Sequence, residues 1–152
     1  MEQRTTGEAA DLASLLWQVR EVVERAVSGT VELHQVAATG DLHGLAAAEQ
    51  SLAATLRDLR GIEVLRAAEA DALAGRVGQP PGATLAQLAE AADEPWTTIL
   101  RDHIDALRRL TTQLDRVAQE LRQALDTGGD DVQAARRTAE DARQLSLLDF
   151  LA

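Results

Sequence analysis

The residues best suited to chemistry in this sequence are its three histidines, His34, His43 and His103. The chain has no cysteine, so a bound metal would need histidine and carboxylate ligands. Helical di-metal proteins meet this need with a glutamate three residues before a histidine on each of two helices. None of the three histidines has a glutamate at that position. We therefore expect no metal site and no other cofactor.

A second chemistry open to histidine is phosphate transfer, in which an exposed imidazole carries the phosphoryl group. The two candidates are His34, in "HQVAATG", and His43, in "HGLAAAE". Phosphotransfer modules of the four-helix type usually have a lysine and a glycine shortly after the histidine, and this chain has no lysine. A histidine phosphotransfer module is therefore kept as an alternative and not as the leading hypothesis.

The carboxylates mostly have an arginine three or four residues away, as in Glu21 with Arg25 and Glu63 with Arg66. This spacing places opposite charges side by side on the solvated face of a helix. The sequence predicts no strand that could precede a glycine-rich phosphate loop, and no serine, histidine and aspartate can be placed as a triad. We expect no catalytic residues, and hence a protein that is not an enzyme.

The composition favours helices with aliphatic cores. Apolar residues make up 45% of the chain but aromatic residues only 2%, which leaves leucine, valine and alanine to pack the interior. The formal net charge of −10, with arginines scattered among acidic neighbours, argues against a nucleic-acid partner. No stretch is apolar enough for a membrane span or a signal peptide, so we expect a cytoplasmic protein.

Apolar residues at alternating steps of three and four predict a first long helix over residues 6–39. Thr5 and Glu8 have the spacing of a capping box, and Gly40 suits a left-handed helix end. Asp41 then caps a second helix, which we expect to lie antiparallel to the first. The predicted seam of the first helix consists of Leu12, Leu15, Leu16, Val19, Val22, Val23, Ala26, Gly29, Thr30, Leu33, Val36 and Ala37.

The prolines all fall in one window, at Pro80, Pro81 and Pro95. The first two end the second helix, because proline has no amide for a helical hydrogen bond. Thr84 and Gln87 predict a capping box for a short helical island, and Pro95 suits the first turn of a last long helix. The predicted seam of the second helix changes phase near Gly61 and continues through Ile62, Leu65, Ala68, Ala72 and Leu73.

Two large rings stand out against these helical patterns. The predicted seam of the last long helix consists of Trp96, Leu100, His103, Leu107, Leu110, Leu114, Val117, Leu121 and Ala124. We expect His103, at a seam position, to be a hydrogen-bonded core histidine. Trp17 falls on the face of the first helix opposite its seam. Either another part of the chain, such as the C-terminal arm, covers Trp17, or the helix of a client protein does.

The predicted fold is all-α: an elongated antiparallel bundle of three long helices, with a short helical island and a C-terminal helical arm. We expect the bundle in residues 1–126 and the arm in residues 127–152. The arm is rich in alanine and charge until its last eight residues, "LSLLDFLA", which are mostly apolar and which we expect to be available for a partner. The predicted partner-binding residues are Trp17, Leu145, Leu147, Leu148, Phe150 and Leu151.

The order of these pieces resembles the FlgN-type flagellar export chaperones. The matching stretches are "ATGDLHGLAAAEQSLAATLRDLRGIEVLRAAEADAL", "VGQPPGATLAQLAEA" and "LRDHIDALRRLTTQLDRVAQELRQAL", within about residues 10–125. The resemblance implies a non-enzymatic chaperone that keeps hook-associated proteins of the hook-filament junction soluble in the cytoplasm and delivers them to the flagellar export apparatus. It also implies that the C-terminal part engages an amphipathic helical terminus of the client.

A third hypothesis is a purely structural bundle that dimerises through its tail and has no client. A heptad seam serves packing within one chain and packing between two chains equally well. The sequence is thus compatible with a monomer and with a homo-oligomer. It assigns neither a particular client nor a contact for the island between Pro81 and Pro95.

Overall fold

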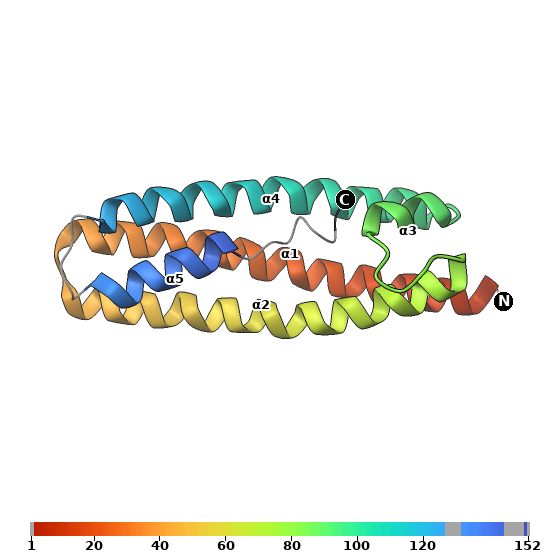
Figure 1. Cartoon of the computed structure of the whole chain (residues 1–152), viewed down its shortest axis with the longest axis horizontal. Coiled ribbons are helices and arrows are strands. Elements are labelled where there is room, and N and C mark those ends of the chain that lie inside the picture. Colours follow the sequence, from red (N-terminus) through yellow and green to blue (C-terminus); the bar gives the residue numbers. More distant parts are fainter. Residues whose placement is uncertain (1, 127–131, 145–150, 152) are drawn as a thin grey trace. The chain divides into compact units, whose positions relative to one another are not determined.

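The computed structural model describes residues 2–126, 132–144 and 151 of the chain, and all regular structure within these ranges is helical. This confirms the all-α prediction. Across the described ranges, no helix combines the length and the apolar character that crossing a membrane requires. The helices are α1 (Glu2–Thr39), α2 (Leu42–Val77), α3 (Leu85–Ala91), α4 (Trp96–Leu125) and α5 (Gln133–Gln144) (Figure 1).

The chain forms two compact units. Unit 1 comprises Met1–Glu21, Arg60–Arg109 and Leu147–Ala152, and unit 2 comprises Val22–Leu59 and Leu110–Ser146. Helices α1, α2 and α4 contribute residues to both units, whereas α3 belongs to unit 1 and α5 to unit 2.

The seam predicted for the first long helix is largely buried. In unit 1 it supplies Leu12, Leu16 and Val19, each with no exposed surface. Thr30 is buried in unit 2 because its hydroxyl donates a hydrogen bond to the carbonyl of Ala26, 2.7 Å away, which satisfies the polar group inside the core. The other buried seam residues of α1 are Val22, Val23, Ala26 and Leu33.

The predicted start of this helix is wrong. Helix α1 begins at Glu2, so Thr5 lies inside the helix and cannot form a capping box with Glu8. The Glu8 carboxylate instead accepts from the side chain of Arg76 on α2, with Nε 3.0 Å from Oε1. Thr5 and Glu8 therefore have the spacing of a capping box, but Glu8 forms a contact between α1 and α2 instead.

The corner between α1 and α2 is as predicted. Gly40 adopts the left-handed conformation, with φ of 74°, and the Asp41 carboxylate accepts from the amide of Gly44 at 3.0 Å. After this turn, α2 packs back along α1 within unit 2. Gly29 illustrates the contact, since a Cβ at that position would lie 3.4 Å from Cδ1 of Leu52.

The island between the prolines also folds as predicted. Helix α2 ends at Val77, and Gly78 follows with φ of 75°. The Thr84 hydroxyl accepts from the Gln87 amide at 3.2 Å, and the Gln87 side chain accepts from the Thr84 amide at 2.8 Å, which completes the capping box of α3. This short helix buries Leu85 and Leu88 and lies beside the start of α4 (Figure 1).

The second half of α2 departs from the prediction. Leu65 was expected in the seam but is 57% exposed, and its neighbour Val64 is 71% exposed. The core position is taken by Arg66, which is 8% exposed and pairs with Glu63 at 3.3 Å between Nε and Oε2. Burial raises the pKa of the Glu63 carboxyl, against the opposing effect of Arg66. The expected solvated face is therefore wrong for this pair.

Helix α4 carries the predicted seam, with Leu100, His103 and Leu107 buried in unit 1. Trp96 and Leu110 are only half-buried and Ala124 is exposed, so the seam is less complete than its spacing predicts. The buried seam residues of α4 in unit 2 are Leu114, Val117 and Leu121.

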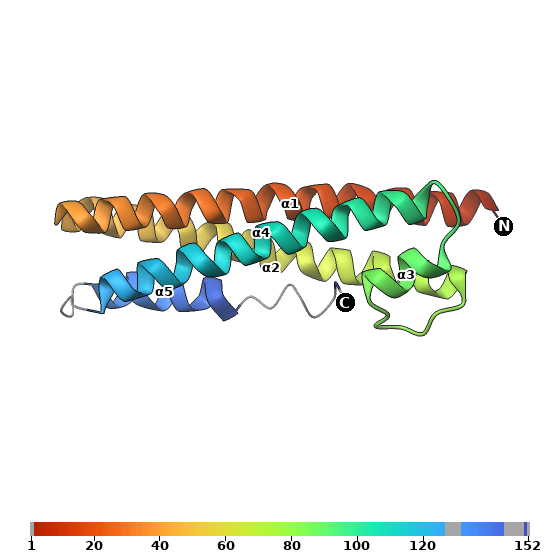
Figure 2. The same cartoon turned by 90° about the horizontal axis from the view of Figure 1, so that it is seen from above.

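Helix α5 packs against α4 and α2 in unit 2 through small side chains and charges (Figure 2). Its buried residues are Ala135, Thr138, Ala139 and Ala142. These side chains are small, so each buries little apolar area. The Thr138 hydroxyl donates to Glu49 of α2 at 2.6 Å, which adds a polar contact to this packing.

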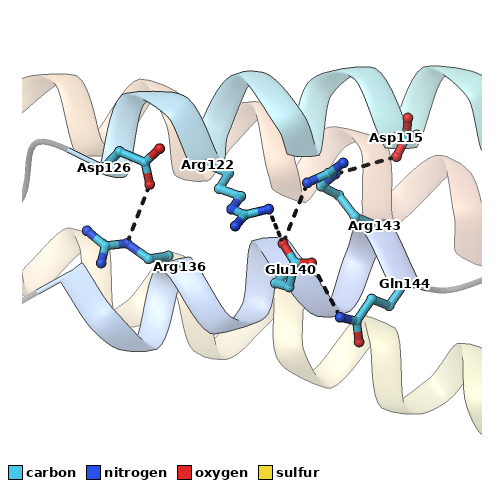
Figure 3. A network of polar contacts seen from close by, with 7 residues as sticks. All are labelled: Asp115, Arg122, Asp126, Arg136, Glu140, Arg143 and Gln144. Carbon is cyan, nitrogen blue, oxygen red and sulfur yellow. Dashed lines mark hydrogen bonds and ion pairs between the residues drawn. The ribbon is translucent and has the colours of Figure 1, made fainter.

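Ion pairs complete the contact between α5 and α4 (Figure 3). The Glu140 carboxylate lies at the centre, with its Oε2 2.8 Å from Nη1 of Arg122 and 3.6 Å from Nη1 of Arg143. Arg143 also approaches Asp115 of α4 at 3.7 Å. Because these groups are partly solvated, each pair contributes only about 0–1 kcal/mol.

We expect Glu140→Ala to loosen α5 without unfolding the chain, since it removes two contacts to arginine at once. Amide hydrogen exchange within α5 should accelerate roughly fivefold, while exchange in α1 stays unchanged. Glu120→Ala, an exposed carboxylate of α4, is the matched control and should leave α5 protected. Equal exchange in α5 for both variants would contradict this account.

We also expect a glycine inside α2 and the glycine that follows its end to respond oppositely to alanine. A Cβ at Gly61 would meet nothing within 4 Å, so Gly61→Ala should stabilise the protein by about 0.5–1 kcal/mol through helix propensity. Gly78→Ala should destabilise it, because alanine is strained at φ of 75°. Urea unfolding measures both changes, and a shift of the same sign in both variants would refute the assignment.

Candidate functional site

The predicted partner-binding residues of the tail fall largely outside the described part of the chain. This applies to Leu145, Leu147, Leu148 and Phe150. Leu151 is described, and it is 1% exposed within unit 1. The expectation that the apolar end is exposed therefore does not hold for the side chain of Leu151. The role of the tail in partner binding remains a prediction.

Trp17 is exposed on the face of α1 opposite its seam, so of the two alternatives left open for it, full cover by another part of the chain does not hold. It keeps 54% of its surface accessible, which is unusual for the largest apolar side chain. The ring is nevertheless held in place. His103 of α4 packs edge-on against it, with ring centroids 5.1 Å apart, and Cζ of Arg20 lies 4.0 Å from the Trp17 ring centroid.

A groove opens beside this ring in unit 1, between α1 and α4, and we call it the Trp17 groove. Its volume is about 650 Å³. Alanines from both helices line it, and Trp96, the only other tryptophan in the chain, lies in its wall. The complete lining is Ala10, Ala13, Trp17, Arg20, Trp96, Ile99, Asp102, His103, Asp105, Ala106 and Arg109.

His103 connects this groove to the core. Nη1 of Arg20 lies 3.4 Å from Nδ1 of His103. Because a guanidinium only donates hydrogen bonds, Nδ1 must accept, and the proton of the neutral ring lies on Nε2. Burial and the charge of Arg20 lower the pKa of His103, while the neighbouring Asp102 opposes the shift. The ring is thus kept neutral under Trp17.

Charges of both signs border the groove. Arg20 and Arg109 supply positive charge, and Asp102 and Asp105 supply negative charge. The lining between them consists of alanine, isoleucine and tryptophan side chains. Such a surface is complementary to an apolar strip that carries charged residues on its flanks.

Trp96 also lines a second cavity, of about 490 Å³. It is lined by Thr5 and Thr6 of α1, by Arg76 and Val77 at the end of α2, and by the segment that joins α3 to α4. Trp96 belongs to both linings. The island between the prolines therefore helps to shape the surface next to the Trp17 groove.

The other histidines are not part of this site. His34, half-buried on α1, and His43, exposed in the first turn of α2, both belong to unit 2, whereas His103 belongs to unit 1. Among the residues that the structure describes, no group of three or more histidine, aspartate or glutamate side chains is arranged to hold a metal ion.

Trp17 was predicted from the sequence as a site residue, but the residues that surround it in the groove were not. Trp96 was assigned to the seam of the last helix, and Arg20 was not singled out. One signal was present: tryptophan is costly to leave in water, and the chain has only two. The rotation of α1 relative to α4 decides which of their faces meet beside Trp17. Residue spacing within one helix does not give this rotation.

The lowered pKa of His103 predicts a pH dependence of stability. As the pH falls through about 6.5, the unfolded chain binds a proton at His103 more readily than the folded protein does. Protonation therefore favours the unfolded state, and the free energy of unfolding should fall. His103→Gln should flatten this dependence in urea unfolding between about pH 7.5 and pH 5.5. His43→Gln, a substitution at an exposed position, should keep it. An unchanged slope in His103→Gln would refute the role of this ring.

Comparison of the chain with known protein families, curated proteins and solved structures finds no match.

Proposed function

We propose that this protein is a non-enzymatic carrier that binds an amphipathic helix of a client protein in the Trp17 groove. One observation carries the proposal. Trp17 remains 54% exposed beside a groove of about 650 Å³. The chain has only two tryptophans, and the second one, Trp96, lines the same groove. Tryptophan is enriched at the residues that dominate the energy of protein interfaces.

The local geometry supports a ring that is ready to bind. Arg20 lies over the Trp17 ring and the His103 ring packs nearly perpendicular to it, so the indole has ordered contacts from both helices. An anchor that is already ordered loses little conformational entropy when a partner covers it. The neutral state of His103 also avoids placing a second positive charge next to Arg20.

The groove suits a helical ligand. It lies between two helices, and small side chains on both, Ala13 on α1 and Ala106 on α4, allow a third helix to approach closely. A client helix with apolar residues at steps of three and four would place them against these alanines and the indole rings. The charges at the border then favour clients whose flanking charges are complementary.

We further propose that the carrier is a FlgN-type flagellar export chaperone. Its clients would be hook-associated proteins of the hook-filament junction, held in the cytoplasm and passed to the flagellar export apparatus. The order of the chain's pieces supports this assignment: the Gly40–Asp41 corner, the proline break and the capped island. The apolar tail residues, Leu145, Leu147, Leu148 and Phe150, are proposed as a second contact with the client.

The fold proposed for this function is an elongated antiparallel bundle of the three long helices α1, α2 and α4. Each of these helices continues without a break from one unit into the other, which supports a single bundle. Helix α3 is the short island, and α5 begins the C-terminal arm.

Trp17→Ala tests the proposed function. We expect it to weaken binding of a labelled peptide, taken from the helical terminus of a hook-associated protein, by about 2 kcal/mol or roughly thirtyfold in Kd. Fluorescence anisotropy of the peptide measures the change. Val31→Ala is the matched control, because Val31 is also an exposed apolar residue of α1, at 39%, but belongs to unit 2.

The same titration separates the groove from the tail. A chain that ends at residue 144 should bind more weakly if the tail contributes, whereas binding through the groove alone would leave its Kd unchanged. Circular dichroism shows whether each variant remains folded. Equal affinity of the wild type, Trp17→Ala and Val31→Ala for the peptide, or no binding by the wild type, would defeat the proposal.

A further inference from the structure

The residues that α4 contributes to the Trp17 groove form two rows along the helix. The first row is buried or half-buried and consists of Trp96, Ile99, His103 and Ala106. The second row is fully exposed, and we call it the α4 edge; it consists of Asp102, Asp105 and Arg109. Residues in each row follow one another at steps of three and four, so each row keeps to one side of the helix.

The charges of the α4 edge are available to a partner. Arg109 lies one helical turn after Asp105, but no ion pair or hydrogen bond joins the two side chains to each other or to any further residue that the structure describes. The Asp102 carboxylate acts within the described chain only through its charge, on the neighbouring His103. The edge thus presents two negative charges followed by a positive one.

The α1 side of the groove has no comparable pattern. Its described lining consists of Ala10, Ala13, Trp17 and Arg20. Arg20 is the charged residue of this set, and its guanidinium is already engaged, over the Trp17 ring and 3.4 Å from Nδ1 of His103. A charged client residue therefore finds its open partners along α4.

We propose that the client helix carries opposite charges seven residues apart on the flank that faces α4. Its basic residue pairs with Asp102 and Asp105, and its acidic residue pairs with Arg109. Asp102 and Arg109 are themselves seven residues apart, or about 10.5 Å along the helix axis. Seven residues make two helical turns, so both charges of the client lie on one flank beside its apolar strip. The inference rests on the proposed function and names the class of client that the groove selects.

The apolar lining and the α4 edge have different roles in this recognition. The alanines and the indole rings accept any helix with a suitable apolar strip, whereas partly solvated charges add little affinity and mainly discriminate against wrong partners. A client with its two charges in the opposite order brings like charges together along the edge. Turning that client end for end does not remove the mismatch, because the turn moves its charged flank to the α1 side.

Two designed helical peptides test the charge pattern. Both have leucines at steps of three and four, and both carry one lysine and one glutamate, seven residues apart, on the same flank. They differ only in the order of the lysine and the glutamate. We expect the full-length wild type to bind the peptide whose order matches the α4 edge about tenfold more tightly, measured as Kd by fluorescence anisotropy.

The decisive measurement exchanges the charges of the protein. Asp102→Arg combined with Arg109→Asp reverses the order of charges along the α4 edge and keeps the net charge, so this variant should prefer the other peptide, again by about tenfold. Arg101→Asp, at an exposed position of α4 that does not line the groove, is the matched control and should keep the wild-type preference. Circular dichroism shows whether each variant is folded.

Trp17→Ala separates this inference from the proposed function. It should weaken both peptides alike, because the ring contacts the apolar strip that they share. If the wild type binds both peptides equally and Trp17→Ala weakens both, the carrier function stands and the charge pattern is refuted. The charge pattern is also overturned if the wild type binds neither peptide, or if the exchanged variant keeps the preference of the wild type.

Discussion

The structure depends on a core that aliphatic side chains must build almost alone. With aromatic residues at 2% of the chain, leucines such as Leu12, Leu16 and Leu107 fill the interior, and all three are fully buried. Leucine and alanine let helices approach closely and fill the core at the density typical of protein interiors. Both tryptophans are outside the core, and both border the same groove. The largest rings of the chain therefore line the Trp17 groove and not the core.

His103 is the point at which that core supports the surface. It occupies a seam position in α4 and is 2% exposed, yet its ring edge meets Trp17 and its Nδ1 faces Arg20. An aliphatic residue would fill the same space without giving Arg20 an acceptor. A neutral histidine does both, and its lowered pKa keeps it neutral. His103 therefore fills a core position and also contacts Trp17 and Arg20 beside the groove.

Much of this fold could be predicted from the sequence because the signals were local. The Gly40–Asp41 corner and the Thr84 capping box each need only a few neighbouring residues, and both formed as predicted. Spacing also placed Trp17 opposite the seam of α1, and its exposure is one of the two alternatives that this position left open. What could not be predicted was set by contacts between distant segments: Glu8 pairs with Arg76 and does not cap α1, and Trp96 joins Trp17 in one groove. The apolar tail, a further part of the predicted site, is described only at Leu151.

The second half of α2 shows why a correct spacing can still give a wrong face. The stripe that includes Leu65 has the period of a core seam, so sequence reasoning placed it inside. The helix instead buries Arg66, whose long aliphatic stem can pack while its guanidinium pairs with Glu63. A buried ion pair gives little stability compared with leucine in the same place. Spacing gives the period of an apolar seam, but contacts with the other helices of the unit decide which of two neighbouring faces of α2 is buried.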